Sequence, residues 1–271
     1  MLRRLALLSC LVLRPPAGAG AEPAGAAGLP PPLLHAALGR LAGDFDRWAY
    51  TETRLRTDEQ GVPQPETVIR FDPSQPYAEQ YRPLKIKGRP PTERQLREYR
   101  RRGVKRGEKL AREEAEGKIP GSELPRFSVN GGNAAIDLAR ATVVGESATS
   151  VTYEVPLRYD GRGNLPVEKL QLLARVNKAQ RAFENVALKV RSAFRVKLVV
   201  KVRTGEANLD FASVDPAQAP VLTAVSGDAT ATVFFVKFGG SFDVKRTDFR
   251  RVKPYSERFG VKIGPLKALD F

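Results

Sequence analysis

The chain has 271 residues, and its 45 Lys and Arg against 30 Asp and Glu give a net charge of +15. It has one cysteine, Cys10, and one histidine, His35, so it lacks the parts of a disulfide framework, a Cys–His pair or a His-rich zinc site. A Ser-His-Asp triad would depend on His35, which belongs to a predicted helix. We therefore expect no metal, no cofactor and no catalysis, and the basic excess indicates an anionic partner or a solubilising surface.

The first 21 residues have the pattern of a secretory signal peptide. Arg3 and Arg4 precede an apolar stretch from Leu5 to Leu13, and small residues follow at Ala19-Gly20-Ala21. The apolar stretch is far shorter than the roughly 20 residues that span a bilayer. We expect cleavage near Ala21 and a periplasmic mature protein. Lipid attachment at Cys10 is a less favoured alternative, because cleavage there would divide the apolar stretch.

A flexible lead over residues 22–32, rich in Ala, Gly and Pro, precedes the first predicted helix. Apolar residues then recur at spacings of three and four from Leu34 to Phe45. This period places them on one side of a helix over residues 33–45, and we expect that side to lie on a sheet.

Three extended segments are predicted next. Aromatic and threonine residues alternate over 48–56, and a polar turn containing Gly61 returns the chain into a second strand over 66–71. A further extended segment over 77–87 is interrupted at Pro83.

A highly charged helix is predicted over residues 92–118, with ten basic and six acidic residues. Thr92 and Gln95 have the spacing of a capping box at its start. With so few apolar residues, this insertion at about 90–121 should be a solvated arm, frayed at Gly103 and Gly107 and dispensable for folding. Its one aromatic residue within the basic run disfavours nucleic acid, which normally needs several stacking rings. The candidates for contact with anionic headgroups are Arg100, Arg101, Arg102, Lys105 and Arg106.

From residue 127 onward the pattern is that of antiparallel strands with one apolar and one polar face. Strands are predicted over residues 151–159, 170–176, 181–190, 195–203, 229–238 and 241–252. Gly239-Gly240 is predicted to be the turn between the last two. Paired carboxylates are the groups that glycoside hydrolysis requires, but the pairs in this sequence fit turns, caps or solvated strand faces better than a catalytic role. These pairs are Asp44 with Asp46, Asp210 with Asp215, and Asp243 with Asp248.

Several of these segments together resemble the periplasmic lipoprotein carriers of the Lol system (LolA/LolB-like), which sort outer-membrane lipoproteins, and their uncharacterised relatives. The segments are LLHAALGRLAGDF, RWAYTETRLR, TDEQGVPQ, ETVIRFDPSQPY and SGDATATVFFVKFGGSFDVKRTDFRRV. The charged arm has no counterpart that we can place in those carriers.

The resemblance implies a mainly β (α+β) fold: an incomplete antiparallel β-barrel of about ten strands, covered by the N-terminal helix. Residues 33–271 would form this single half-barrel domain. Its concave apolar face would hold a lipid or an acylated protein, with an anionic membrane surface as a further candidate partner. The alternative is an envelope scaffold or protein-interaction module without a lipid cavity. The candidate ligand-binding residues are Trp48, Tyr50, Val151, Tyr153, Val155, Leu198, Val200, Phe234 and Val236.

Overall fold

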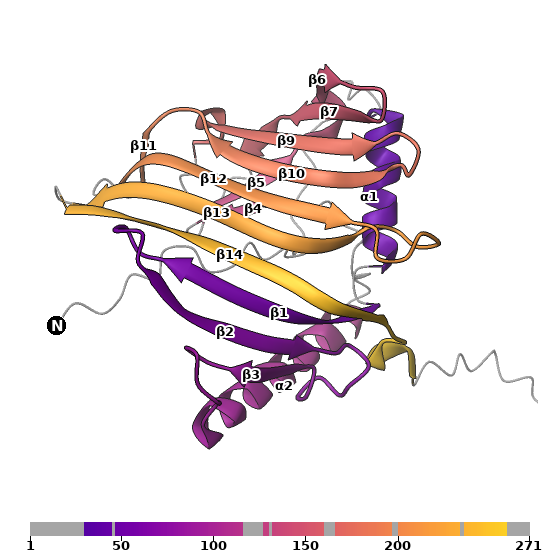
Figure 1. Cartoon of the computed structure of the whole chain (residues 1–271). Helices are drawn as coiled ribbons and strands as arrows, with labels where there is room; N and C mark the ends of the chain where they lie inside the picture. The colour runs from indigo at the N-terminus through magenta and orange to yellow at the C-terminus, as the bar shows by residue number, and fades with distance from the viewer. Residues whose placement is uncertain are drawn as a thin grey trace, which may run out of the picture.

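The computed structural model describes residues 30–44, 47–115, 127–129, 132–159, 166–196, 200–233 and 236–258. The predicted signal peptide, most of the flexible lead and Phe45 lie outside the described residues. The described part is mainly β, with two α-helices and three short 3₁₀-helices (Figure 1).

One large antiparallel sheet forms the body of the fold. Its strands lie in the order β3-β2-β1-β14-β13-β12-β10-β9-β7-β6, with β11 paired to β12, so β3 and β6 are its open edges. The strands are β1 (Trp48–Thr57), β2 (Pro63–Phe71), β3 (Tyr81–Lys85), β6 (Thr142–Glu146), β7 (Ser150–Val155), β9 (Leu170–Asn177), β10 (Ala182–Val190), β11 (Phe194–Val196), β12 (Val200–Ala212), β13 (Val221–Val233) and β14 (Val236–Arg251).

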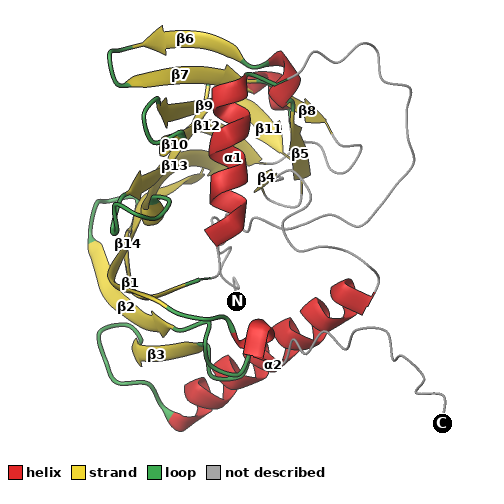
Figure 2. Cartoon of the chain, turned by 90° about the vertical axis from the view of Figure 1, so that its right-hand side faces the viewer, coloured by secondary structure: helices red, strands yellow, loops and turns green. Residues whose placement is uncertain are grey.

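The remaining elements lie on one side of this sheet. Figure 2 shows the strands from β6 to β3 as a curved layer, with both helices on its concave side. A second sheet has the order β4-β5-β8. These elements are α1 (Pro32–Asp44), α2 (Glu93–Ala115), β4 (Phe127–Val129), β5 (Gly132–Ile136), β8 (Leu157–Tyr159) and the 3₁₀-helices η1 (Leu138–Arg140), η2 (Val167–Lys169) and η3 (Tyr255–Arg258).

The hydrophobic core lies between α1 and the upper strands of the sheet. Leu34 and Ala37 of α1 are each 1% exposed and belong to one cluster with the inward residues of β7, β9 and β10. On β9 the predicted alternation is confirmed, because Leu170, Leu172, Ala174 and Val176 are all buried. Burial of such side chains stabilises a fold by about 25 cal/mol per Å² of apolar surface.

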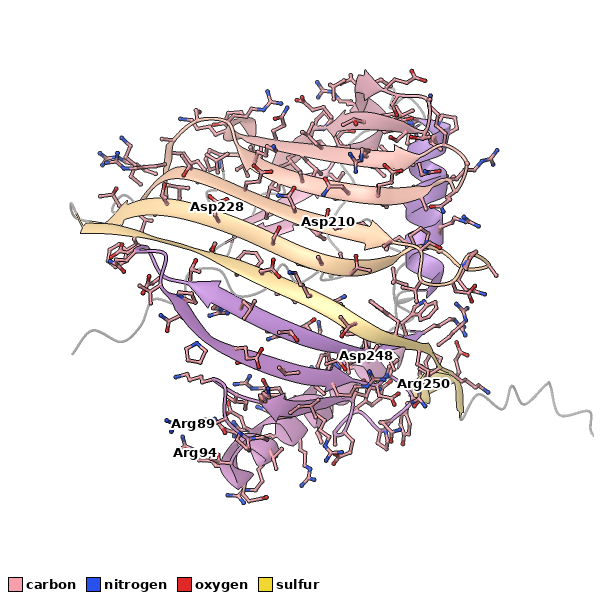
Figure 3. All side chains as sticks on the ribbon, viewed as in Figure 1. Arg89, Arg94, Asp210, Asp228, Asp248 and Arg250 are labelled. Carbon is pink, nitrogen blue, oxygen red and sulfur yellow. The ribbon has the colours of Figure 1, made fainter. Side chains whose placement is uncertain are left out.

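The opposite, convex face of the sheet is polar. Asp210 and Asp228 project from this face (Figure 3). The Nδ2 group of Asn185 donates a hydrogen bond to Asp210 across β10 and β12 at 2.7 Å. An apolar concave face and a solvated convex face are the arrangement expected for an antiparallel sheet with one packed side.

Two of the predicted strands, over 151–159 and 195–203, are interrupted in the structure. The segment predicted over 151–159 divides at Pro156 into β7 and β8, which belong to different sheets. The segment predicted over 195–203 contains a hairpin, because Val196 pairs with Val200. In both segments every second residue is apolar on either side of the break. The alternation therefore could not reveal where the strand ends.

The predicted turn at Gly239-Gly240 is also wrong. Both glycines lie inside β14, where Gly239 pairs with Thr230 and Gly240 with Ala229. The change of direction falls earlier, since Val233 pairs with Val236. Gly240 has a φ of 140°, and a Cβ there would overlap the carbonyl oxygen of Thr57 on β1. Glycine is needed at this position for close approach to the neighbouring strand rather than for a turn.

Candidate ligand-binding cavity

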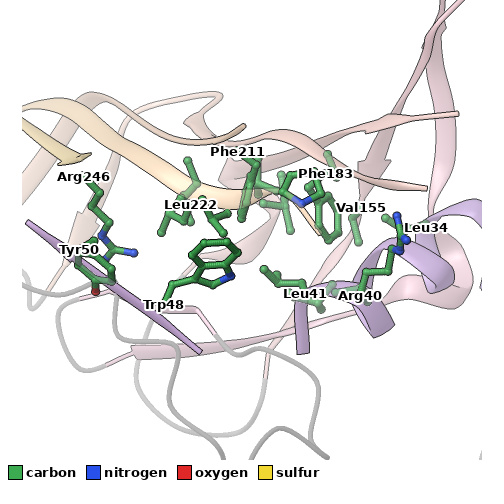
Figure 4. Close-up of a pocket in the computed structure, with 18 of the residues that line it drawn as sticks. Leu34, Arg40, Leu41, Trp48, Tyr50, Val155, Phe183, Phe211, Leu222 and Arg246 are labelled. Atoms are coloured by element: carbon green, nitrogen blue, oxygen red, sulfur yellow. The ribbon is translucent and has the colours of Figure 1, made fainter. Parts of the chain in front are cut away.

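A cavity of about 210 Å³ lies between α1 and the concave face of the sheet. Apolar side chains from both sides make most of its wall, and Figure 4 shows several of them facing one another across it. The lining residues are Leu34, Leu38, Arg40, Leu41, Trp48, Tyr50, Phe71, Tyr81, Ile136, Leu138, Val155, Leu172, Ala174, Phe183, Val186, Leu209, Phe211, Pro220, Val221, Leu222, Arg246 and Phe249.

Three of the candidate ligand-binding residues line this cavity: Trp48 and Tyr50 of β1 and Val155 of β7. Val151 and Tyr153 are buried in the same core but do not line the cavity.

The other candidate ligand-binding residues do not contribute to the described wall. Val200 is half-buried at the start of β12 and is absent from the cavity lining. Leu198 and Phe234 lie outside the described residues, and Val236 begins β14. Val200 and Val236 stand at the first positions of β12 and β14, next to the hairpins that Val196–Val200 and Val233–Val236 pairing closes, rather than in the middle of these strands.

Sequence reasoning missed most of the aromatic wall. Phe183, Phe211 and Phe249 come from β10, β12 and β14, and Phe183 and Phe211 have ring centres 5.9 Å apart. The alternation of Leu209, Asp210 and Phe211 is the signal that could have revealed the middle of β12.

A charged cluster borders one end of the cavity. Arg246 of β14 lines the wall, and its guanidinium lies 4.4 Å from the centre of the Tyr50 ring. Its Nε–H donates to Glu52 at 3.0 Å, and the Nε–H of Arg54 donates to the other carboxylate oxygen at 2.6 Å. Glu52 is only 5% exposed, so the two guanidinium groups supply the partners that a buried carboxylate requires.

Burial raises the pKa of Tyr50 well above its ordinary value, and this effect outweighs the lowering by Arg246. The same is true of Tyr81, where burial raises the pKa and Arg106 opposes the rise. Both phenols are therefore neutral at physiological pH. The end of the cavity near β1 to β3 thus combines neutral hydroxyls with a guanidinium.

Trp48 contributes an unpaired donor to the wall. Its side chain is 6% exposed, and its Nε1 is buried without a hydrogen-bond acceptor among the described residues. A buried donor without a partner costs about 1–3 kcal/mol. Trp48 is held by ring contacts with Phe249, at 6.3 Å between ring centres, and with the guanidinium of Arg251, at 5.7 Å.

The five candidate headgroup-binding residues all lie on α2, but they do not share one environment. Arg101 and Lys105 are exposed. Arg100 pairs with Glu79 at 3.0 Å, and Arg102 pairs with Glu98 one turn earlier in the helix.

Arg106 is instead part of the fold. Its guanidinium is half-buried, lies 4.4 Å from the centre of the Tyr81 ring and donates to Oε1 of Gln80 at 2.7 Å. These contacts take it away from the solvent face of α2, so the expectation that Arg106 contacts headgroups is not supported by its position.

The predicted capping box at the start of α2 is present. The backbone N–H of Gln95 donates to Oγ1 of Thr92 at 3.4 Å, and the N–H of Thr92 donates to the side chain of Gln95 at 2.8 Å. These two bonds satisfy donors that would otherwise be free at the first turn.

The expectation that α2 frays at its glycines is wrong. Gly103 and Gly107 are buried, and a Cβ at either would overlap Tyr77, at the backbone in one case and at the ring in the other. The absence of side chains lets this face of the helix approach Tyr77 closely. The sequence showed few apolar residues and therefore concealed a packed helix face that is made of glycine.

Neither a metal-binding cluster nor a membrane-spanning helix occurs among the described residues. No group of three or more His, Cys, Asp or Glu side chains there could hold a metal ion. In the same part of the chain, no helix is long and apolar enough to cross a membrane.

Comparisons with known proteins give no family for this chain. No family model matches it, and no curated protein matches it significantly. Among solved structures, the complex of Pseudomonas aeruginosa MucA/MucB is similar at 10% identity and a TM-score of 0.18, covering 82% of this chain and 99% of that chain. A likeness at this level supports no conclusion about fold, partner or function.

Proposed function

We propose that the protein is an exported, noncatalytic carrier that holds the acyl chain of a lipid or of a lipidated protein in the cavity between α1 and the sheet. The observation that carries this proposal is the apolar cavity itself, walled by Leu and Phe side chains from the sheet and from α1. In this proposal the open sheet is an incomplete barrel, and α1 is its cover.

The size of the cavity sets the scale of the ligand. An apolar cavity of about 150 Å³ is large enough to bind benzene, and this one measures about 210 Å³. Typical pockets for drug-sized ligands begin near 300 Å³. The cavity as it stands therefore suits a short acyl segment. A longer chain would require α1 to move outward from the sheet.

An anionic membrane surface is a fitting partner for the exposed side of α2. Arg94, Arg97, Arg101 and Lys105 are exposed along this helix, and Arg94 projects into solvent near its start (Figure 3). Each basic residue near an anionic bilayer contributes about 1 kcal/mol of attraction. In this proposal α2 brings the carrier to the membrane, and the cavity receives the chain there.

Mass spectrometry of lipid extracted from the natively purified protein tests the carrier proposal. We expect an acyl lipid, or an acylated polypeptide, in near-stoichiometric amount, and its release when excess fatty acid is added. A protein that carries no acyl compound and takes up none, while remaining folded, would favour the envelope scaffold instead.

A further inference from the structure

Trp48 is the residue of the cavity wall with an unexplained chemical feature. Its Nε1–H is buried and meets no acceptor in the described part of the chain. In Figure 4 the nitrogen edge of the indole faces away from Arg246 and toward Leu41 of α1. The donor is therefore directed across the cavity, at the side where α1 closes it.

A buried donor in a folded protein normally has an acceptor, because leaving it unpaired is unfavourable. A buried water would need about two to four polar partners, and most of the side chains that line the cavity are apolar. Leu41, toward which the indole nitrogen faces in Figure 4, offers none. An acceptor that arrives with the ligand would satisfy the donor without requiring a second protein group.

The charges of the wall favour an acceptor with negative character. Arg40 and Arg246 line the cavity, Arg246 is paired with Glu52 at 3.0 Å, and no Asp or Glu is among the described residues that line it. A bare hydrocarbon would use neither the arginines nor the indole N–H. An acyl group has both parts, because its chain is apolar and its carbonyl or carboxylate oxygen is an acceptor.

We propose that the cavity binds an acyl group whose carbonyl or carboxylate oxygen accepts a hydrogen bond from Nε1–H of Trp48. This inference rests on the proposed function for the acyl chain, and it adds the atom that recognises the ligand and the chemistry of the ligand's polar end. A free fatty acid and an acyl ester both supply such an oxygen.

Trp48 is the single tryptophan of the chain, so the protein labelled with ¹⁵N gives one indole N–H resonance, which needs no assignment by mutation. The probes are decanoate, methyl decanoate and decane. We expect the indole proton resonance to move downfield with decanoate, with methyl decanoate or with both, and not with decane. A response to decanoate alone would identify the free acid as the source, and a response to both would include esters.

Replacement of Trp48 by benzothienylalanine, which has a sulfur in place of N–H, keeps the fused ring and provides a second readout. The acyl probe that shifts the resonance should bind this protein about 3- to 10-fold more weakly than it binds the unmodified one, and decane should bind both equally.

The outcomes separate this inference from the proposed function. Acyl probes that bind but leave the indole resonance unmoved, and that bind the sulfur-containing protein equally well, would overturn the inference and leave the carrier function standing. If none of the three probes binds the unmodified protein, the carrier function fails as well.

Discussion

The guanidinium of Arg106 lies 4.4 Å from the centre of the Tyr81 ring, so a residue of α2 stacks on a residue of β3. Arg106 also donates to the side chain of Gln80, which is itself only 6% exposed. Through this pair the charged helix is attached to the edge of the main sheet. Strand β3 pairs with β2, and β2 pairs with β1, which carries cavity residues. The main sheet therefore connects α2 to the wall of the cavity.

Arg106→Ala should lower the free energy of unfolding by about 2 kcal/mol, because it removes a stacked cation and a charge-assisted hydrogen bond. Arg101→Ala is the matched control on the exposed side of the same helix and should change stability by less than about 0.5 kcal/mol. Urea unfolding of the two variants measures the difference. Equal effects would mean that α2 is the solvated arm that its composition suggests.

Gly103→Ala should loosen the docking of α2, because the added methyl group overlaps the carbonyl oxygen of Tyr77. We expect faster tryptic cleavage within the helix and a loss of about 1–3 kcal/mol of stability. Gly39→Ala on α1 is the control, since a Cβ there meets nothing within 4 Å. That change should stabilise the protein by up to about 1 kcal/mol through helix propensity alone. A stabilised Gly103→Ala variant would contradict the close packing.

Asp72 should make the protein sensitive to acid. Burial alone would raise the pKa of its carboxyl, but hydrogen bonds from the hydroxyl and backbone N–H of Ser74, together with Arg250, bring the pKa below its ordinary value of 3.8. A depressed pKa in the folded state stabilises the protein above pH 3.8, and this contribution is lost as the pH falls through the folded value. Asp72→Asn should be less stable than the wild type at neutral pH, and the difference should shrink below about pH 4. Unfolding curves measured across this range check the prediction, and a difference independent of pH would contradict it.

The exposed basic side of α2 should govern binding to anionic vesicles. Arg101→Ala combined with Lys105→Ala should weaken binding by about 10- to 30-fold at low salt, and added salt should weaken the wild type in the same direction. Lys201→Ala combined with Lys245→Ala removes the same charge from exposed positions of the sheet and should have a smaller effect. Co-sedimentation with vesicles measures all three proteins. Equal losses in the two double variants would indicate an unspecific effect of net charge.

Strands were predicted best where a run of alternating apolar residues ends at a polar turn. The hairpin of β1 and β2, and the pair β9 and β10 around the turn after Asn177, follow from alternating apolar residues bounded by polar turn residues. The prediction failed at Pro156. There a single alternating segment is divided between β7 of the main sheet and β8 of the second sheet.

Candidate site residues were predictable on β1 and β7, where Trp48, Tyr50 and Val155 belong to clear alternating strands. Arg246 and Phe249 were not. They reach the same wall from β14, and their orientation depends on irregularities in the pairing of β1 with β14 and on Asp248, which has a φ of 53°. Such local changes of register decide which side chains face inward, and they leave no period in the sequence.

Binding of a fluorescent fatty acid to the wild type and to Ala174→Phe tests the central claim most directly. Ala174 is 4% exposed and lines the cavity, so a phenyl ring there fills the space that the acyl chain would take. Thr230→Phe, at an exposed position of the same sheet, is the matched control. We predict saturable one-to-one binding by the wild type and the control, and a loss of at least about tenfold in affinity for a folded Ala174→Phe protein. Equal affinity in all three proteins, or no binding by the folded wild type, would contradict the account.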